Sequence, residues 1–189
     1  MKKAIVATAL SAAILSGGVT ASATTMKAGF EPAQVVAPTA PNMSNYGVPD
    51  SIKVPAGSEL VGNFKAAGVQ IYGCVNATWT FIQPAANLTN LGWSMAVHFA
   101  GPANPRWEST KDGSLVGAVK VASVDQPGSI PQLLLRAVEN TGGTGTQFGA
   151  VSYVQRLNTA GGAAPASSCA NGSQIGVQYT AEYKFWANH

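Results

Sequence analysis

The sequence predicts an all-β fold: a single-domain antiparallel β barrel or sandwich of about eight or nine short strands, with at most one short helix. Beyond residue 51, short apolar or alternating runs are separated by glycine, proline, asparagine and aspartate, which is the pattern of strands and turns. So many short strands in one domain avoid exposed edges by closing into a barrel or packing as a sandwich. No repeat of roughly 20 to 50 residues stands out, which argues against a propeller or a solenoid.

Residues 1–23 have the three parts of a Sec-type signal peptide. Lys2 and Lys3 give a positive start, an apolar run extends from Ala4 to Leu15, and Ala21-Ser22-Ala23 forms an A-x-A cleavage site. The apolar run is shorter than the roughly 20 residues that cross a bilayer, and no second run follows. We therefore expect a secreted or periplasmic protein without a membrane span.

A Pro/Ala-rich linker is predicted over residues 24–50, which have neither helical nor strand periodicity, and the all-β domain over residues 51–189. Removing the signal peptide removes two lysines and no acid, so most of the formal charge of +3 is lost with it. Nucleic acids and anionic membranes are bound largely by clustered Lys and Arg, and no such cluster occurs here. We expect neither as a partner.

The chain has two cysteines, Cys74 and Cys169, and in an oxidising compartment an even pair is most simply a disulfide. With only His98 and His189 as further ligands, the usual tetrahedral set of Cys and His is not completed. The sequence therefore predicts a Cys74–Cys169 disulfide and no metal site.

The first strands are expected as a hairpin and its continuation. Residues 60–66 and 69–75 are separated by Ala67-Gly68, which predicts a turn between two strands. A third strand follows over residues 77–84, and we expect it to end at Pro84 because proline cannot donate to a sheet ladder.

The run over residues 93–99 predicts a strand by its alternation. Ala96 and His98 share one face, and Val97 and Phe99 share the other. His98 is therefore expected either as a hydrogen-bonded residue of the interior or as the polar group of a pocket.

The second half of the domain predicts four more strands, over residues 115–124, 132–138, 150–158 and 177–186. Residues 130–140 fit a helix equally well, because Pro131 suits a first helical turn and Leu133 to Leu135 could be buried. Both alternatives stay open. Asn158-Thr159 is expected to begin a turn that Gly161-Gly162 completes.

Five motifs occur in a fixed order along the domain. They are GVQIYGC (68–74), HFAGP with later WE and DGS (98–114), IPQLLLRA (130–137), VQRLNTAGGAAP (154–165) and YTAEYKF (179–185). In this order they resemble a family of secreted bacterial and fungal proteins catalogued as a domain of unknown function, number 3455. The resemblance implies export and covers most of the chain after the linker, and it supplies no reaction.

Some fungal relatives in that family carry a malate dehydrogenase label. Nicotinamide binding by a Rossmann fold needs G-x-G-x-x-G directly after a strand and at the start of a helix. The nearest stretch, GGTGTQFG at residues 142–149, has the wrong spacing and precedes a strand. We therefore expect a glycine-rich hairpin there, no cofactor, and no NAD-dependent dehydrogenase.

Glu108, Asp112 and His98 are the catalytic candidates. Two carboxylates that flank a scissile bond carry out glycoside hydrolysis, so these residues define the alternative of a secreted, metal-independent hydrolase or lyase. The structural alternative has Asp112-Gly113 as a tight turn and Glu108 as a solvated residue or the partner of Arg106 or Lys111.

His98, Trp107 and Arg156 are the ligand-binding candidates, since an indole offers a rigid face and arginine a planar fork of donors. Arg156 in a strand needs an acidic or carbonyl partner, and we expect an ion pair with Asp112 or Glu108. Without a complete catalytic set, the leading expectation is a non-catalytic extracellular or envelope-associated binding or structural protein, with a pocket for a small molecule or carbohydrate.

Overall fold

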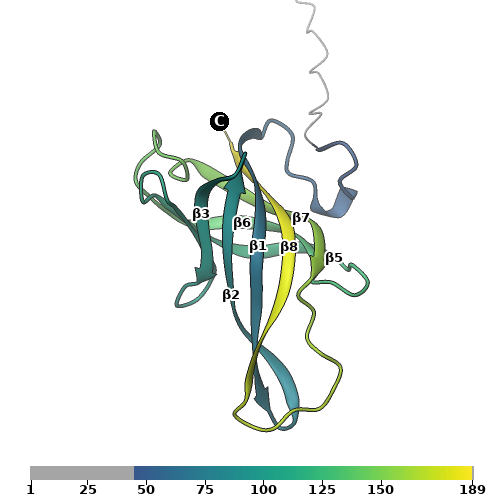
Figure 1. Cartoon of the computed structure of the whole chain (residues 1–189). Coiled ribbons are helices and arrows are strands. Elements are labelled where there is room, and N and C mark those ends of the chain that lie inside the picture. The colour runs from purple at the N-terminus through teal and green to yellow at the C-terminus, as the bar shows by residue number, and fades with distance from the viewer. Residues whose placement is uncertain (1–44, 189) are drawn as a thin grey trace, which may run out of the picture. The chain divides into compact units, whose positions relative to one another are not determined.

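The predicted strands close on themselves. The computed structural model describes residues 45–188, where eight antiparallel strands form a closed barrel in chain order, with β8 pairing to β1 (Figure 1). The all-β prediction is confirmed, in its barrel form. The strands are Glu59–Val75 (β1), Thr78–Asn90 (β2), Trp93–Ala100 (β3), Pro105–Ser109 (β4), Leu115–Val124 (β5), Gln132–Thr141 (β6), Val151–Gly161 (β7) and Gln174–Ala187 (β8). A turn of 3-10 helix, Asp50–Ile52 (η2), precedes them.

β1 is one continuous strand, so the turn predicted at Ala67-Gly68 is wrong. Gly68 is needed for close packing instead: a side chain there would overlap the carbonyl of Ala85 and the backbone of Ala86 on β2. The hairpin turns at Asn76-Ala77, whose φ angles of 52° and 58° are those of a type I′ turn.

β2 continues through Pro84, where we expected it to end. The pairing of β2 with β3 stops at Ala86 and His98, so no β3 residue needs the N–H that Pro84 lacks. The β1–β2 hairpin therefore extends well past the neighbouring part of the barrel wall, as Figure 1 shows.

β6 and β7 test two further predictions, the possible helix over residues 130–140 and the turn at Asn158-Thr159. The run over residues 130–140 leads into a strand and not a helix: β6 begins at Gln132 and pairs with β5 on one side and β7 on the other. β7 continues to Gly161, so the turn predicted at Asn158-Thr159 is wrong. The register with β8 shifts between Leu157 and Ala160, and Asn158 has a φ of 51°, which identifies a bulge within the strand.

β4 lies between the predicted strands over residues 93–99 and 115–124, where the sequence pattern indicated no strand. It pairs with β3 and with β5, and its five residues are too few for alternation to reveal a strand. The glycine-rich residues 142–149 connect β6 to antiparallel β7, so they do not form the strand-to-helix turn of a nucleotide site.

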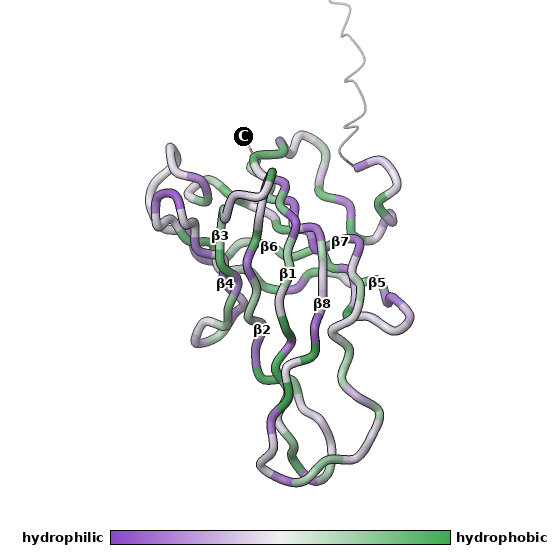
Figure 2. Tube along the Cα trace, in the orientation of Figure 1, coloured by the Kyte–Doolittle hydropathy of each residue, from purple (hydrophilic) through white to green (hydrophobic). Residues whose placement is uncertain are grey.

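The main core fills the barrel with side chains from alternate positions of the strands, an alternation that can be followed in Figure 2. Aromatic rings dominate it. Phe185 contacts Phe64, Trp107 and Phe148 at ring-centroid distances of 5.6, 6.0 and 4.6 Å. This part of the interior is therefore filled with large, rigid side chains.

A second core lies on the outside of the wall, beneath the segment that leads into β1. Val48, Ile52 and Val54 pack against Leu134 and Leu157, together with Trp186. Val48 belongs to this core although it precedes Ser51, where we expected the domain to begin.

Gln155 joins this segment to the wall. Its buried side-chain amide donates to the Ile52 carbonyl at 2.7 Å and accepts from the Trp186 indole N–H at 2.9 Å. We predict that Gln155→Met lowers the free energy of unfolding by about 2 kcal/mol, because it leaves a buried carbonyl and a buried indole N–H without partners. Urea unfolding measures this, with Gln178→Met, at an exposed position of β8, as the control. Equal stability of both variants would contradict this role.

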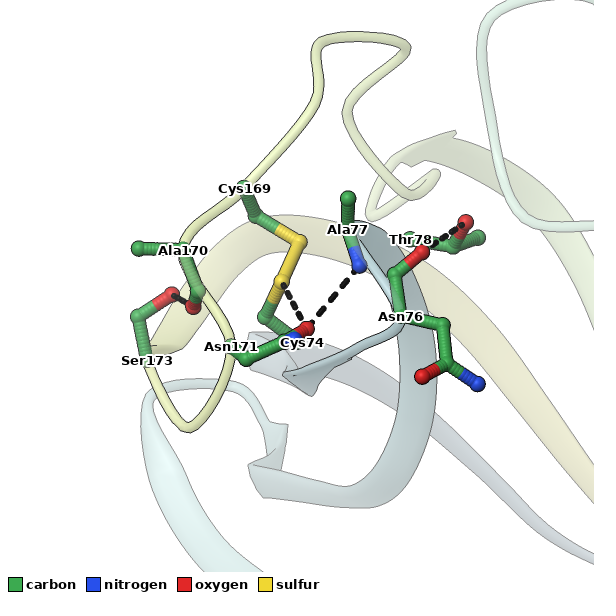
Figure 3. The surroundings of a disulfide bond; sticks show 8 residues. All are labelled: Cys74, Asn76, Ala77, Thr78, Cys169, Ala170, Asn171 and Ser173. Atoms are coloured by element: carbon green, nitrogen blue, oxygen red, sulfur yellow. Dashed lines mark hydrogen bonds between the residues drawn. A yellow bond between two sulfur atoms is a disulfide. The ribbon is translucent and has the colours of Figure 1, made fainter.

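The predicted disulfide is present and links Cys74 to Cys169, 95 residues apart (Figure 3). Cys74 lies near the end of β1, and Cys169 lies in the connection before β8. The same connection reaches the hairpin turn, where the Ala77 N–H donates to the side-chain oxygen of Asn171 at 2.9 Å. The disulfide and this hydrogen bond hold the β7–β8 connection to the tip of the β1–β2 hairpin.

Candidate ligand-binding site

A cavity of about 480 Å³ lies in the part of the barrel that the aromatic core leaves unfilled. Residues of every strand from β1 to β7 and of the β3–β4 and β5–β6 connections line it. Most of its lining is apolar, and its polar side chains are Gln70, Tyr72, His98, Asn104, Lys120 and Arg156. This volume lies in the range of small-molecule sites.

Two of the three predicted binding residues, His98 and Arg156, line this cavity. Trp107 does not, and with only 1% of its surface exposed it lies behind His98. All three, with Tyr183, line a second space of about 30 Å³. The structure therefore brings the three residues together, although Trp107 backs the site and does not form its open face.

His98 is held by Trp107 and the β4 backbone. Its ring stacks on the indole at a centroid distance of 4.4 Å with 2° between the planes, and Tyr183 meets both rings edge-on. The pairing of His98 directly opposite Trp107 on β3 and β4 produces this stack. His98 Nδ1 lies 2.9 Å from the carbonyl oxygen of Arg106, to which it donates when protonated.

Burial lowers the pKa of His98 to about 3, the hydrogen bond to the Arg106 carbonyl raises it, and the charge of Arg156 lowers it further. The ring is therefore neutral at ordinary pH, with the proton on Nδ1 and a lone pair on Nε2. His98 thus adds a polar, uncharged surface to the cavity.

Arg156 has a carbonyl partner and not an acidic one. Its Nε donates to the Pro131 carbonyl at 3.0 Å, and no carboxylate of residues 45–188 lies within ion-pair distance of its guanidinium. The predicted ion pair with Asp112 or Glu108 is therefore wrong. The Pro131 carbonyl can accept this hydrogen bond because Pro131 directly precedes β6, in which Leu133 pairs with Arg156.

The interior beside Arg156 contains polar atoms without hydrogen-bond partners. These are Gln70 Nε2, Trp107 Nε1 and the hydroxyl oxygens of Tyr179 and Tyr183, all buried and none with a partner at good hydrogen-bond geometry. Tyr179 nevertheless interacts with the side chains of Gln70 and Tyr183, and Tyr183 interacts with Arg156. Burial raises the pKa of both tyrosines, and the charge of Arg156 acts in the opposite direction on each. Buried polar atoms usually find partners, so several unpartnered ones near one cavity mark a place where a ligand or water completes the set.

The catalytic candidates do not meet. Glu108 is exposed and pairs with Val97, so it lies on the outer face of the wall while His98 points inward. Asp112 lies in the β4–β5 turn, where it accepts hydrogen bonds from Ser114 and the Gln147 N–H, and these lower its pKa.

The expected partner of Arg106 is also different. Arg106 forms a forked pair with Glu139 of β6, at 2.9 and 2.7 Å, and not with Glu108. Glu139 lies opposite Gly117, and Gly117 lies opposite Arg106, so the absence of a side chain on the strand between them lets the two reach each other. Sequence spacing could not reveal a pair that spans three strands.

Gln70, Tyr72 and Lys120 are site residues that the sequence analysis missed. Gln70 and Tyr72 share the inward face of β1 with Phe64 and Ala66, and the hydroxyl of Tyr72 donates to the Gly162 carbonyl at 2.6 Å. A single strand over residues 59–75 would have placed Gln70 and Tyr72 on the inward face by alternation. The turn expected at Ala67-Gly68 divided this strand in the prediction, so the alternation was not followed through.

The described part of the chain, residues 45–188, holds no group of three or more His, Cys, Asp or Glu that could bind a metal ion. Within the same range no helix is long and apolar enough to cross a membrane. The signal peptide and linker predicted over residues 1–50 lie mostly outside the described residues, as does His189.

Fold and cavity together define a small antiparallel barrel with a ligand-sized internal space. The family model described as Protein of unknown function (DUF3455) matches residues 91–187, and the chain belongs to that family. The resemblance carried by the five motifs is thereby confirmed. The match spans β3 to β8 and includes His98, Trp107 and Arg156. Comparisons with curated proteins and with solved structures found no match.

Proposed function

We propose that this chain is an exported, non-catalytic binding protein that holds a small molecule inside its barrel. The observation that carries the proposal is the cavity of about 480 Å³, in which apolar walls surround a small number of polar side chains. Most ligand sites have this composition, because apolar surface supplies affinity and a few polar groups fix orientation. The disulfide supports export, since such bonds persist in oxidising compartments.

The position of the cavity also supports binding. The aromatic core fills the interior beside it, and the His98–Trp107 stack holds the polar side chain of His98 in one orientation. The exposed apolar side chains of Phe81 and Ile82 line the same space from the β1–β2 hairpin. A ligand in the cavity would cover apolar surface that otherwise faces water, which favours its binding.

The hydrolase or lyase alternative gains no support from the geometry. It requires Glu108 and Asp112 to act with His98 on one substrate, and neither carboxylate lines the cavity that His98 lines. Paired carboxylates act across roughly 5 to 10 Å of a shared cleft. We therefore propose binding without catalysis.

The test uses phenylnaphthylamine, a neutral apolar dye whose fluorescence rises when it leaves water. We predict that the protein binds the dye and that Ala100→Trp, which adds a large side chain to the cavity wall, weakens binding by about tenfold or more because overpacking removes the space. Titration of the dye with each protein measures the two dissociation constants.

Val97→Trp is the matched control, because Val97 lies on the same strand and faces outward, with 40% of its surface exposed. It should bind the dye as the unchanged protein does. If Ala100→Trp binds the dye as tightly as Val97→Trp, the dye lies elsewhere and the cavity is not the binding site.

A further inference from the structure

The cavity carries positive charge and no negative charge. None of its lining residues is Asp or Glu, whereas Arg156 lies in its wall and Lys120, which is exposed, lies at its edge. Arg156 also lines the smaller space beside Trp107, so its side chain extends to the inner end of the site. This arrangement favours an anion over a cation and over a neutral molecule.

The charge of Arg156 is not balanced by a carboxylate within residues 45–188. This charge acts on the groups around the cavity. It lowers the pKa of His98, and it counteracts the rise in pKa that burial causes at Tyr72, Tyr179 and Tyr183. Arginine inside a protein normally pairs with an anion, and its fork of donors fits two oxygen atoms of a planar acid. An occupant with a carboxylate would complete this pair.

Several unpartnered atoms near Arg156 are donors. The Nε2 amide of Gln70, which lines the cavity with only 3% of its surface exposed, makes no hydrogen bond of good geometry, although it interacts with the hydroxyl group of Tyr179. The hydroxyl groups of Tyr179 and Tyr183 interact with each other, and that of Tyr183 also interacts with Arg156, but none of these contacts has good hydrogen-bond geometry. Tyr183 lines the smaller space beside Arg156. These donors lack acceptors of good geometry, and a carboxylate, which accepts hydrogen bonds through two oxygen atoms and donates none, would supply them.

The rest of the wall selects an apolar body. Ile130, Leu133 and Leu135 line one part of the cavity, and Phe81 and Ile82 line another. A sugar needs hydrogen-bond partners all around its ring, whereas most of this wall is apolar. A phosphate dianion carries two charges, and only one of the two cations of the cavity, Arg156, lies in its wall, because Lys120 is exposed at the edge.

Resting on the proposed binding function, we propose that the ligand is a monocarboxylic acid with an apolar body, whose carboxylate accepts hydrogen bonds from Arg156 and Gln70 while the body packs against the apolar wall. Lys120 at the edge of the cavity attracts the acid before it enters.

The experiment measures displacement of phenylnaphthylamine by phenylbutyrate and by its neutral amide, phenylbutyramide. Phenylbutyrate should displace the dye from the protein, and the amide should need about a tenfold or higher concentration, because a hydrogen bond to a charged group is stronger than one to a neutral group. Phenylphosphate and glucose, as representatives of the other ligand classes, should displace the dye less well than phenylbutyrate.

The variants are Arg156→Gln, which removes the charge, and Arg156→Lys, which keeps it. Arg156→Gln should bind phenylbutyrate about tenfold or more weakly than the unchanged protein, and Arg156→Lys should recover part of the loss, with the dissociation constant of the dye measured separately for each variant and used to correct its displacement curve. Arg136→Gln, the same change at an exposed position of β6, is the matched control and should leave phenylbutyrate binding unchanged.

The outcomes separate the two proposals. If the protein binds the dye but phenylbutyrate has no advantage over phenylbutyramide, the carboxylic acid is wrong and the binding function stands. If the dye does not bind at all, both the proposed binding function and the carboxylic acid ligand are wrong. Should Arg156→Gln not fold, the comparison of acid with amide on the unchanged protein decides the matter alone.

Discussion

Replacing both Cys74 and Cys169 by serine should lower the free energy of unfolding by about 4 kcal/mol. The two cysteines are 95 residues apart in the chain, so the disulfide restricts a long loop of the unfolded state, and loop-closure entropy assigns about 4 to 5 kcal/mol to a loop of that length. For a protein of this size the melting temperature should fall by roughly 10 to 15 °C. Differential scanning calorimetry measures both quantities.

Reduction supplies the control for this prediction. A reducing agent should lower the melting temperature of the unchanged protein to that of the double serine variant and leave the variant itself unaffected. β1 and β8 remain paired through Tyr72 and Ile175 next to the lost bond, so the variant should still fold. A loss below about 1 kcal/mol would mean that this pairing already restricts the unfolded chain, against the loop-entropy account.

The strand content of this fold could be predicted because half-buried strands alternate. The runs over residues 93–99, 115–124 and 177–186 lie within β3, β5 and β8, since each has one face toward the core and the other toward water. The errors at Ala67-Gly68 and Pro84 share one cause. Glycine and proline were taken as breaks, but Gly68 fits a tight strand contact and Pro84 faces no partner on β3.

The candidate site was only partly predictable, because its residues meet through barrel closure. His98 and Trp107 lie nine residues apart and face each other by a register that the sequence does not state. Arg156 reaches them from β7 and Gln70 from β1, and these two strands come near each other only because β8, which pairs with both, closes the ring. The need of a strand arginine for a partner therefore suggested an ion pair with Asp112 or Glu108, whereas the closed barrel gives Arg156 the carbonyl of Pro131.

Acid should destabilise the protein through His98 at a higher pH than through Asp50 and Asp112. The folded protein holds the pKa of His98 at about 3 because of burial, against 6.5 when the side chain is free, so between these values only the unfolded chain takes up the proton. The contribution of the neutral His98 to the free energy of unfolding is fully present above pH 6.5. It falls by up to about 1.4 kcal/mol per pH unit below that value and is lost near pH 3. From pH 6.5 to about pH 4 the loss should reach roughly 3 kcal/mol.

Among His98, Asp50 and Asp112, only His98 acts on stability in this pH range, and the comparison with His98→Asn tests the assignment. The pKa values of Asp50 and Asp112 are lowered from 3.8, so their contribution to stability is lost only at lower pH. An asparagine amide can replace the Nδ1 donor to the Arg106 carbonyl and takes up no proton. Urea unfolding should give His98→Asn a shallower loss of stability between pH 6.5 and about pH 4 than the unchanged protein. Two results would contradict this assignment: equal slopes of the free energy of unfolding against pH for the two proteins, or NMR signals of the folded His98 imidazole that titrate near pH 6.5. Either result would mean that folded His98 takes up protons freely and is not the neutral, stacked ring described above.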